Sequence, residues 1–275
     1  MPKLKSYAHL TSAPHRIVSL APNVTSILCA IGARRQLVGV TRWCPDVVPD
    51  LTSDGANLRK LPLLGDCWHV ESLDTIAKLR PSLIIGSVPF HAEAVQRILQ
   101  IPAQFLALNP RSLADIESDI QTLALITNRH ASGRRLIRRM RTEFAEIHRL
   151  AAKSRDKPRI YSEAWPKPRI SSPPWVSEII ELCGGTMVLK PGAKVSDEEV
   201  AAARPDFILL AWTATANRCN PQKTLSHPLW QAVPAIRHKR VFVIRDELLN
   251  TPGPPLIAGA REILRILKNN SGAYQ

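Results

Sequence analysis

A helix followed by Arg-Pro and then a strand occurs twice in this chain, at residues 72–85 and 196–209. The copies read SLDTIAKLRPSLII and SDEEVAAARPDFIL, so each has a capping serine, a stop at Arg-Pro and an apolar strand. Corresponding positions are 124 residues apart throughout. One such unit in each half favours two similar lobes, although a single α/β sheet can also contain the pattern twice. The two-lobe interpretation fails if both copies lie side by side in one sheet.

A long amphipathic helix is predicted between the two copies, over residues 130–153. Apolar residues recur there at three- and four-residue steps, while arginines fill the other faces. At 1.5 Å per residue such a helix is about 36 Å long, similar to the width of a small domain. We interpret it as a backbone helix that joins two lobes. The alternative is one covering helix of a single doubly wound domain.

Strands and helices alternate on both sides of this helix, which is typical of parallel α/β layering. The predicted fold class is α/β, with two similar lobes that each contain a central parallel sheet. The predicted parts are an N-terminal arm at 1–15, a first lobe at 16–129, the connecting helix at 130–154 and a second lobe at 155–275. Strands are expected at 16–20, 37–41, 83–86, 104–108, 158–162, 187–189, 207–211 and 240–244, helices at 25–31, 71–79, 92–99, 112–127, 176–182, 196–203, 229–233 and 255–268, and loops at 21–23, 42–46, 163–175 and 212–221.

The chain is strongly basic, with 37 Lys and Arg against 23 Asp and Glu and a net charge of +14. Such an excess suggests an anionic partner. The basic residues are dispersed, however, and we find no nucleic-acid-binding signature, so nucleic acid is not expected as a partner. The five cysteines contain no C-x-x-C pair, and a disulfide framework is not expected in a chain of 275 residues. No G-x-S-x-G, phosphate loop, H-E-x-x-H or dinucleotide motif supports an enzyme.

Both copies of the repeated unit carry an acid two residues after the serine, Asp74 and Glu198. An acid in the first turn of a helix is stabilised by the helix dipole by about 0.3–1 kcal/mol, and this alone explains each of them. Equivalent acids on two lobes would also present a pair of charges that arginines of a partner can bind.

An ordered set of segments resembles the ABC-transporter substrate-binding proteins of the iron-siderophore/cobalamin type. The set comprises RIVSLAPNVTSIL, LVGVT, VESLDTIAKLRPSLII, CGG and VSDEEVAAARPDFIL, within residues 16–268. The resemblance implies two α/β lobes bridged by one backbone helix, with the ligand held in a cleft between the lobes. The loop at 39–46 and the pair Gly184-Gly185 look most like the cobalamin-binding branch.

This resemblance implies a protein that captures a corrinoid, cobalamin, and delivers it to an ABC importer. The metal-bearing chelate would be cargo, and no cofactor of the protein's own is expected. By the same resemblance Asp74 and Glu198 match the acids that dock on arginines of the permease, although Asp74 is shorter than the Glu more typical there. A monomer is expected.

Two alternatives stay open: a ferric-siderophore or haem carrier of the same fold, and a cytosolic corrinoid-sequestering or sensory protein without a transporter. The resemblance implies a periplasmic location. The N-terminal residues lack the apolar core of a secretory signal, so we expect either a cytoplasmic location or an export sequence missing from this start.

Ligands of open α/β sheets bind outside the carboxyl ends of the strands. Tryptophans dominate the positions that this rule selects, and indole rings suit a broad macrocycle. Any one of them can equally be a half-buried core residue. Cys44, Cys67 and His69 have a spacing that fits no common zinc site, and no metal site is expected. Loop cations that could meet an anionic siderophore instead are Arg42, Arg169 and Arg218, although loop arginines are more often solvated. The candidate ligand-binding residues are Pro22, Asn23, Trp43, Cys44, Trp68, Ser87, Phe90, Trp165, Trp212 and Asp246.

Overall fold

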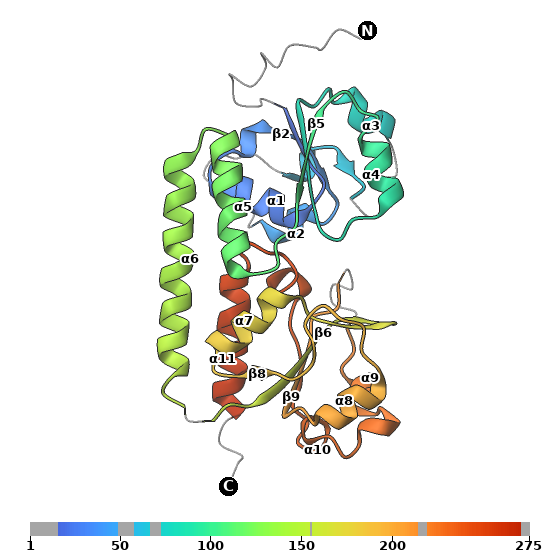
Figure 1. Cartoon of the computed structure of the whole chain (residues 1–275), viewed down its shortest axis with the longest axis vertical. Coiled ribbons are helices and arrows are strands. Elements are labelled where there is room, and N and C mark those ends of the chain that lie inside the picture. The colour runs from blue at the N-terminus through green and yellow to red at the C-terminus, as the bar shows by residue number, and fades with distance from the viewer. Residues whose placement is uncertain (1–15, 49–57, 67–72, 155, 214–218, 271–275) are drawn as a thin grey trace. The chain divides into compact units, whose positions relative to one another are not determined.

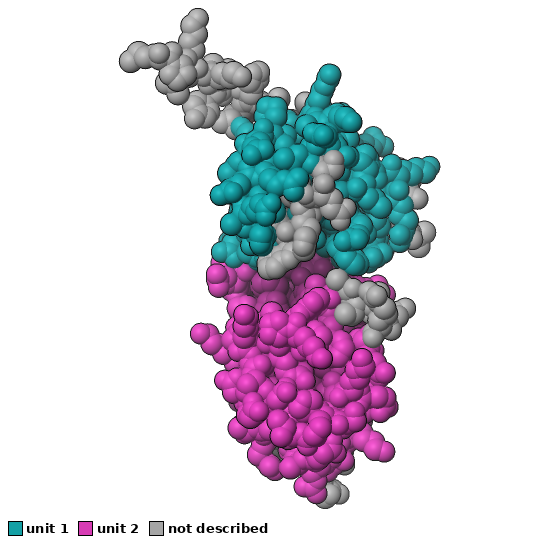
Figure 2. All heavy atoms as spheres, turned by 90° about the vertical axis from the view of Figure 1, so that its right-hand side faces the viewer, with its two compact units in different colours: residues 1–109, 117–136 teal, residues 110–116, 137–275 magenta. Residues whose placement is uncertain are grey.

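The computed structural model describes residues 16–48, 58–66, 73–154, 156–213 and 219–270 (Figure 1). The chain divides into two compact units, one of residues 1–109 and 117–136 and the other of residues 110–116 and 137–275 (Figure 2). Among the described helices, none combines the length and the apolar content that crossing a bilayer requires.

The first unit is built on a parallel sheet with the strand order β3-β2-β1-β4-β5. The strands are β1 (Ile17–Ser19), β2 (Leu37–Thr41), β3 (Leu63–Leu64), β4 (Leu83–Ser87) and β5 (Gln104–Leu108). β1 and β4 are buried along their whole length, as strands covered on both faces must be. Helices α3 (Leu73–Lys78) and α4 (Ala92–Ile98) pack on the face that carries Val18 and Ile84, and α1 (Pro22–Ala30) lies on the other side.

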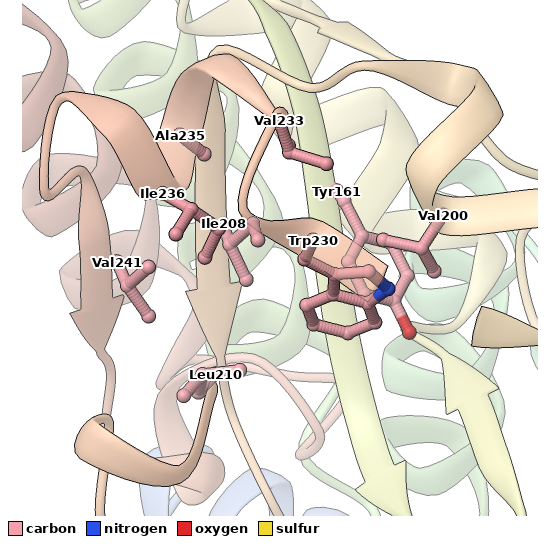
Figure 3. Packing of buried hydrophobic residues seen from close by; sticks show 9 residues of the cluster. All are labelled: Tyr161, Val200, Ile208, Leu210, Trp230, Val233, Ala235, Ile236 and Val241. Atoms are coloured by element: carbon pink, nitrogen blue, oxygen red, sulfur yellow. The ribbon is translucent and has the colours of Figure 1, made fainter. Parts of the chain in front are cut away.

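The second unit contains a sheet of the order β10-β9-β6-β7, in which β8 pairs with the first residues of β6. β7 is antiparallel to β6, and the other pairs are parallel. The strands are β6 (Arg159–Pro166), β7 (Arg169–Ser171), β8 (Thr186–Met187), β9 (Phe207–Leu210) and β10 (Val241–Val243). Trp230 and Tyr161 form the largest part of the core on one face, with their rings edge to face at 6.5 Å (Figure 3).

The helices of this unit lie on both sides of its sheet (Figure 1). One side carries α8 (Asp197–Ala203), α9 (Gln222–Leu225), the 3-10 helix η5 (Pro228–Trp230) and α10 (Pro234–Arg237), and the other carries α7 (Pro174–Leu182) and α11 (Leu256–Asn270). Ser196 and Glu199 form a capping box at the start of α8, so its first turn has its backbone donors satisfied.

The two copies of the repeated unit belong to different sheets, because β4 lies in the first and β9 in the second. This confirms the two-lobe interpretation. The copies share a detail of backbone: Arg80 and Arg204 both adopt the left-handed conformation, at φ 45° and 44°, where each helix ends. An arginine from the first strand of each unit then caps that helix, since the Arg16 guanidinium donates to Leu79 O at 2.6 Å and that of Arg159 to Ala203 O at 2.8 Å.

The helix predicted over 130–153 is present as α6 (His130–Ala151). Its predicted apolar positions are buried: Leu136, Ile137, Met140, Phe144, Ile147 and Ala151. α6 contributes its residues as far as Leu136 to the first unit and those from Ile137 to the second. Near its start a Cβ on Gly133 would lie 2.5 Å from the Cβ of Ala124 in α5 (Leu113–Ile126), so the close approach of these helices requires glycine there.

The loop predicted at 163–175 is wrong. β6 continues to Pro166, the chain turns, and β7 returns antiparallel as far as Ser171. The prolines suggested a loop, but they lie at the end of a strand and in the turn, where a missing N–H removes no essential ladder bond. The consequence is that Glu163 lies inside a buried strand rather than in solvent.

Three shorter predictions also need correction. The expected turn at 21–23 contains the first turn of α1, because Pro22 suits the first helical position. The expected loop at 42–46 includes the short helix α2 (Cys44–Val47), in which Pro45 plays the same part. The helix expected at 229–233 is divided into η5 and α10, since Pro234 begins a new helix. The arm at 1–15 lies outside the described residues.

We expect Gly259→Ala to lower the free energy of unfolding by about 1–3 kcal/mol, measured by urea denaturation. The added Cβ would lie 2.2 Å from Leu248 O, a backbone atom of the 3-10 helix η6 (Asp246–Leu248). This overlap outweighs the gain of about 1 kcal/mol in helix propensity. The control is Ala258→Ser on the exposed side of the same turn, which should stay within about 0.5 kcal/mol of the original protein. Equal effects would contradict the close-packing argument.

Candidate ligand-binding site

The candidate residues of the first unit all follow strands at the carboxyl edge of its parallel sheet. Pro22 and Asn23 come after β1, Trp43 and Cys44 after β2, and Phe90 after β4, which ends at Ser87. Because neighbouring parallel strands end at one edge, the fold places these residues of distant sequence position at the same edge.

Burial separates these residues into two groups. Pro22, Trp43 and Phe90 are half-buried, so part of each side chain remains accessible. Asn23 and Ser87 are each only 3% exposed, and the Asn23 amide donates to Ser87 Oγ at 3.1 Å. They therefore link α1 to β4 beneath the edge and present almost no surface to a ligand.

Cys44 is part of the core rather than of the accessible surface. Its side chain is fully buried, and its sulfur lies 3.0 Å from Thr25 Oγ1 and 3.1 Å from Thr41 Oγ1. Burial raises the pKa of the Cys44 thiol. The neutral thiol therefore links α1 and β2 inside the core and presents no surface to a ligand.

Trp43 is a partly accessible ring at the first edge. The Arg42 guanidinium lies over it, with the Arg42 Cζ atom 5.1 Å from the ring centroid. Phe90 packs edge to face on Phe105 at 6.4 Å. Trp68, with its neighbours Cys67 and His69, lies outside the described residues.

At the carboxyl edge of the second sheet the candidate residues are Trp165, Trp212 and Asp246. Trp165 is 39% exposed near the end of β6, and Trp212 is half-buried just after β9. The Thr213 N–H donates to Ala164 O at 3.0 Å, which brings the two tryptophan-bearing segments together. Asp246 is half-buried in η6, after β10.

The two indoles of this edge are held in different ways. The Trp165 indole N–H donates to Lys167 O at 2.8 Å, a backbone atom of its own hairpin. The Trp212 indole N–H donates to Glu163 Oε1 at 2.7 Å, a carboxylate that is fully buried. The orientation of Trp212 thus depends on a charged group inside the unit.

Glu163 is the centre of a buried polar network that the sequence did not reveal. Besides Trp212, its carboxylate accepts from the Tyr161 hydroxyl at 2.7 Å and from Arg169 Nη1 at 2.8 Å. Arg169 also donates to Asp197 through Nε. With residues 163–175 interpreted as a loop, Glu163 and Arg169 both appeared to be solvated. β6 is in fact buried without interruption over residues 160–164, and no local pattern of the sequence around Glu163 indicated this.

The same network holds Asp197 at the first position of α8. His227 Nε2 lies 3.2 Å from Asp197 Oδ2, and the Trp230 indole N–H donates to Asp197 O at 2.9 Å. The Arg169 guanidinium carbon lies 4.3 Å from the Trp230 ring centroid. Of the three loop cations considered for an anionic siderophore, Arg169 pairs with two carboxylates of its own unit, Arg42 is exposed, and Arg218 lies outside the described residues.

The surroundings of Tyr161, Arg169 and Asp197 shift the pKa of each side chain. Burial and the neighbouring Glu163 carboxylate raise the pKa of Tyr161, so this phenol stays a hydrogen-bond donor. Burial alone would lower the pKa of Arg169, but the Glu163 and Asp197 carboxylates raise it above the ordinary value. Burial alone would raise the pKa of Asp197, but Arg169 and His227 lower it.

Asp74 and Glu198 are exposed in the first turns of α3 and α8. Each helix precedes a parallel strand and ends near its amino end, so each acid lies toward the carboxyl edge of its own sheet. Within the described ranges, no group of three or more His, Cys, Asp or Glu side chains is arranged to hold a metal ion.

Comparison with known proteins identifies relatives of similar length. The profile of a family described as periplasmic binding protein matches residues 17–248. The vitamin B12-binding protein of Photorhabdus laumondii is 24% identical over 97% of this chain and 93% of its own. The solved periplasmic vitamin B12 binding protein BtuF of Vibrio cholerae has a TM-score of 0.73 and 23% identity, covering 94% of this chain and 99% of its own. The periplasmic heme-binding protein RhuT from Roseiflexus sp. RS-1 has a TM-score of 0.76 and 23% identity, covering 93% and 98%. These likenesses confirm the predicted α/β fold class.

We expect Asp197→Asn to lower the free energy of unfolding by about 1 kcal/mol at pH 7, because the side chain loses its charge toward Arg169 and His227 while solvent screens much of the effect. The pKa of Asp197 is lowered in the folded protein, so its contribution is complete above the unfolded pKa of about 4 and is lost as the pH falls through the folded value.

The difference between the variant and the original protein should therefore shrink below pH 4, and urea denaturation at pH 7 and pH 3 measures it. Glu181→Gln, at an exposed position of α7, is the control and should change little at either pH. A difference that is the same at both pH values would show that the Asp197 charge is not the cause.

Proposed function

Since this chain belongs to the periplasmic binding protein family, we propose that it captures a corrinoid, cobalamin, and delivers it to an ABC importer. The observation that carries the proposal is the placement of partly accessible indoles at the carboxyl edges of both sheets: Trp43 in the first, and Trp165 and Trp212 in the second. The sequence analysis predicts that one ligand contacts the carboxyl edges of both sheets, and this stays a prediction.

The chemistry of these edges suits a corrinoid. A corrin ring offers a broad apolar face that indoles can cover, and its neutral amide side chains can donate hydrogen bonds to a carboxylate. Asp246, half-buried in η6 after β10, is the carboxylate that we assign to this role in the second unit. Haem and most ferric siderophores carry negative charge, which would favour a cation at this edge. Arg169 already binds Glu163 and Asp197, so it is not placed to serve them. Arg42, over Trp43 at the first edge, and Arg245, next to Asp246, are exposed cations, so anionic cargo is the competitor that the test must include.

The relatives support the same cargo. Proteins named vitamin B12-binding protein match over almost the whole chain, including those of Photorhabdus laumondii and Pectobacterium carotovorum at 24% and 25% identity. Solved heme-binding proteins share the fold at comparable TM-scores, and at 23% identity or below they support the fold alone. Haem and ferric siderophores are therefore the competing cargo in the test.

Delivery is proposed to use the two exposed acids. A substrate-binding lipoprotein of an ABC transporter in Bacillus subtilis is 22% identical over 91% of this chain, which supports a transporter as partner. Asp74 and Glu198 occupy equivalent positions of the repeated unit, so they provide one acid in each unit for arginines of a permease. An extracytoplasmic location follows from this proposal.

We expect calorimetric titration to show saturable binding of cyanocobalamin and weaker or no binding of hemin and a ferric hydroxamate. Trp212→Ala should weaken cobalamin binding about tenfold or more, because an aromatic anchor of a binding surface contributes at least 1.4 kcal/mol. Leu99→Ala is the control, since Leu99 is 64% exposed at the end of α4, which leads to the amino end of β5. No heat and no shift in melting temperature with cyanocobalamin would overturn the proposal.

We expect the double variant Asp74→Lys, Glu198→Lys to bind cobalamin as tightly as the original protein but to lose most uptake with its ABC importer in proteoliposomes. Reversing both charges replaces attraction to permease arginines by repulsion, without touching the proposed cargo residues. Glu181→Lys on α7 is the matched control, because it changes the charge at another exposed position. Undiminished uptake by the double variant would contradict the docking role.

A further inference from the structure

A continuous series of polar contacts runs from the Trp212 indole to the first turn of α8. Trp212 Nε1 donates to Glu163 at 2.7 Å, Arg169 Nη1 donates to the same carboxylate at 2.8 Å, and Arg169 Nε binds Asp197. The residue after Asp197 is Glu198. The series thus begins at a proposed cargo contact and ends beside a proposed docking acid, and all of it lies within one compact unit.

The burial of the Glu163 carboxylate indicates a role for these contacts beyond packing. Glu163 has no exposed surface, and removing a carboxylate from water costs several kcal/mol unless its partners compensate. Well-packed apolar residues of similar volume would serve stability at least as well. The carboxylate adds a geometric constraint. Its two oxygens accept hydrogen bonds from three donors, and these bonds fix the positions of the donor side chains.

At the other end of the series, Asp197 is held from three sides. Its carboxylate binds Arg169 and His227, and its carbonyl oxygen accepts from Trp230. Figure 3 shows Trp230 and Tyr161 side by side, with the indole nitrogen and the hydroxyl pointing to the same side of the cluster. Arg169 thus contacts both the start of α8, through Asp197, and the buried Glu163 carboxylate.

We propose that Glu163 is a positioning residue that orients the Trp212 indole for cargo and, through Arg169 and Asp197, couples this indole to the first turn of α8. Cargo that stacks on Trp212 changes the direction of its N–H bond to Glu163. The position of the Glu163 carboxylate relative to Arg169 changes with it, and the ion pair between Arg169 and Asp197 changes in turn. The orientation of Glu198 then depends on whether cargo occupies the carboxyl edge of the second sheet. The two end points rest on the proposed function, whereas the coupling itself does not require a ligand.

Amide hydrogen exchange in the free protein tests the coupling without any cargo. The Glu199 N–H donates to Ser196 Oγ at 3.1 Å and the Val200 N–H to Ser196 O at 3.2 Å, so both amides report on the first turn of α8. We expect Trp212→Phe to speed their exchange roughly threefold or more, the size of effect seen for coupled neighbours.

Trp165→Phe is the matched control, because it removes an indole N–H at the same edge whose partner is Lys167 O, outside the series. Its effect on the Glu199 and Val200 amides should be nil. Equal effects of the two substitutions, or no effect of Trp212→Phe, would overturn the coupling.

Glu163→Gln tests the central residue, since it keeps the size of the side chain and removes the charge. It should speed exchange at Glu199 and Val200 at least as much as Trp212→Phe, and adding Trp212→Phe to it should change nothing further. Additive effects of the two substitutions would show that Trp212 influences α8 independently of Glu163 and would overturn the proposal. If Glu163→Gln does not fold, Asp197→Asn combined with Trp212→Phe provides the same test of additivity.

Cobalamin titration of the same variants separates this inference from the proposed function. Weakened binding in Glu163→Gln, with Trp212 itself unchanged, supports the positioning role. If the original protein binds no cobalamin, the proposed function fails, while the exchange rates in the free protein still decide whether Trp212 and α8 are coupled. If cobalamin binds but Trp212→Phe does not change the exchange rates of the α8 amides, the proposed function stands and the coupling fails.

Discussion

Parallel pairing of strands is the interaction on which the candidate site depends. Ile17 pairs with Leu83 in the first sheet and Ile160 with Phe207 in the second. Parallel neighbours cannot be joined by a hairpin, so the chain must return to the amino edge between two parallel strands, as it does through α1, α4 and α8. The residues that follow the strands therefore collect at one edge of each sheet. Trp43 and Phe90 reach the same edge for this reason, although 47 residues separate them.

The exception to parallel pairing is the hairpin of β6 and β7, and it brings charge into the core. In the register of this hairpin Glu163 is opposite Ser171 and Arg169 opposite Pro166, yet the two side chains form an ion pair and both are largely removed from water. Neither charge would be tolerated alone, because a buried ion without a partner costs several kcal/mol. The pair is tolerated since Tyr161, Trp212 and Asp197 complete its hydrogen bonds. The polar centre of the second unit is thus a direct result of how one short edge strand returns.

The two units repeat a local construction more closely than their sequences suggest. In each, a left-handed arginine ends a helix, a proline follows, and the guanidinium of the residue that precedes or begins the first strand caps the last carbonyl groups. Arg16 and Arg159 take part only because the first strand lies beside the strand that follows the helix. From the sequence, the Arg-Pro pairs were visible at a constant spacing, whereas the two capping arginines were 143 residues apart with no pattern to connect them.

Local physics determined what could be predicted from the sequence by itself. The apolar period of α6, the two helix stops at Arg-Pro and the apolar runs of the strands depend on near neighbours along the chain, so the α/β class and the positions of most elements followed from them. The accessible tryptophans at strand ends followed from the general geometry of parallel sheets. Tertiary structure alone decided which candidates are exposed. Cys44, Asn23 and Ser87 are buried because other elements pack over them, and Glu163 is charged and buried because Arg169 and Trp212 come from different strands to meet it. Burial and charge pairing are properties of contacts between distant segments, and no spacing within one segment encodes them.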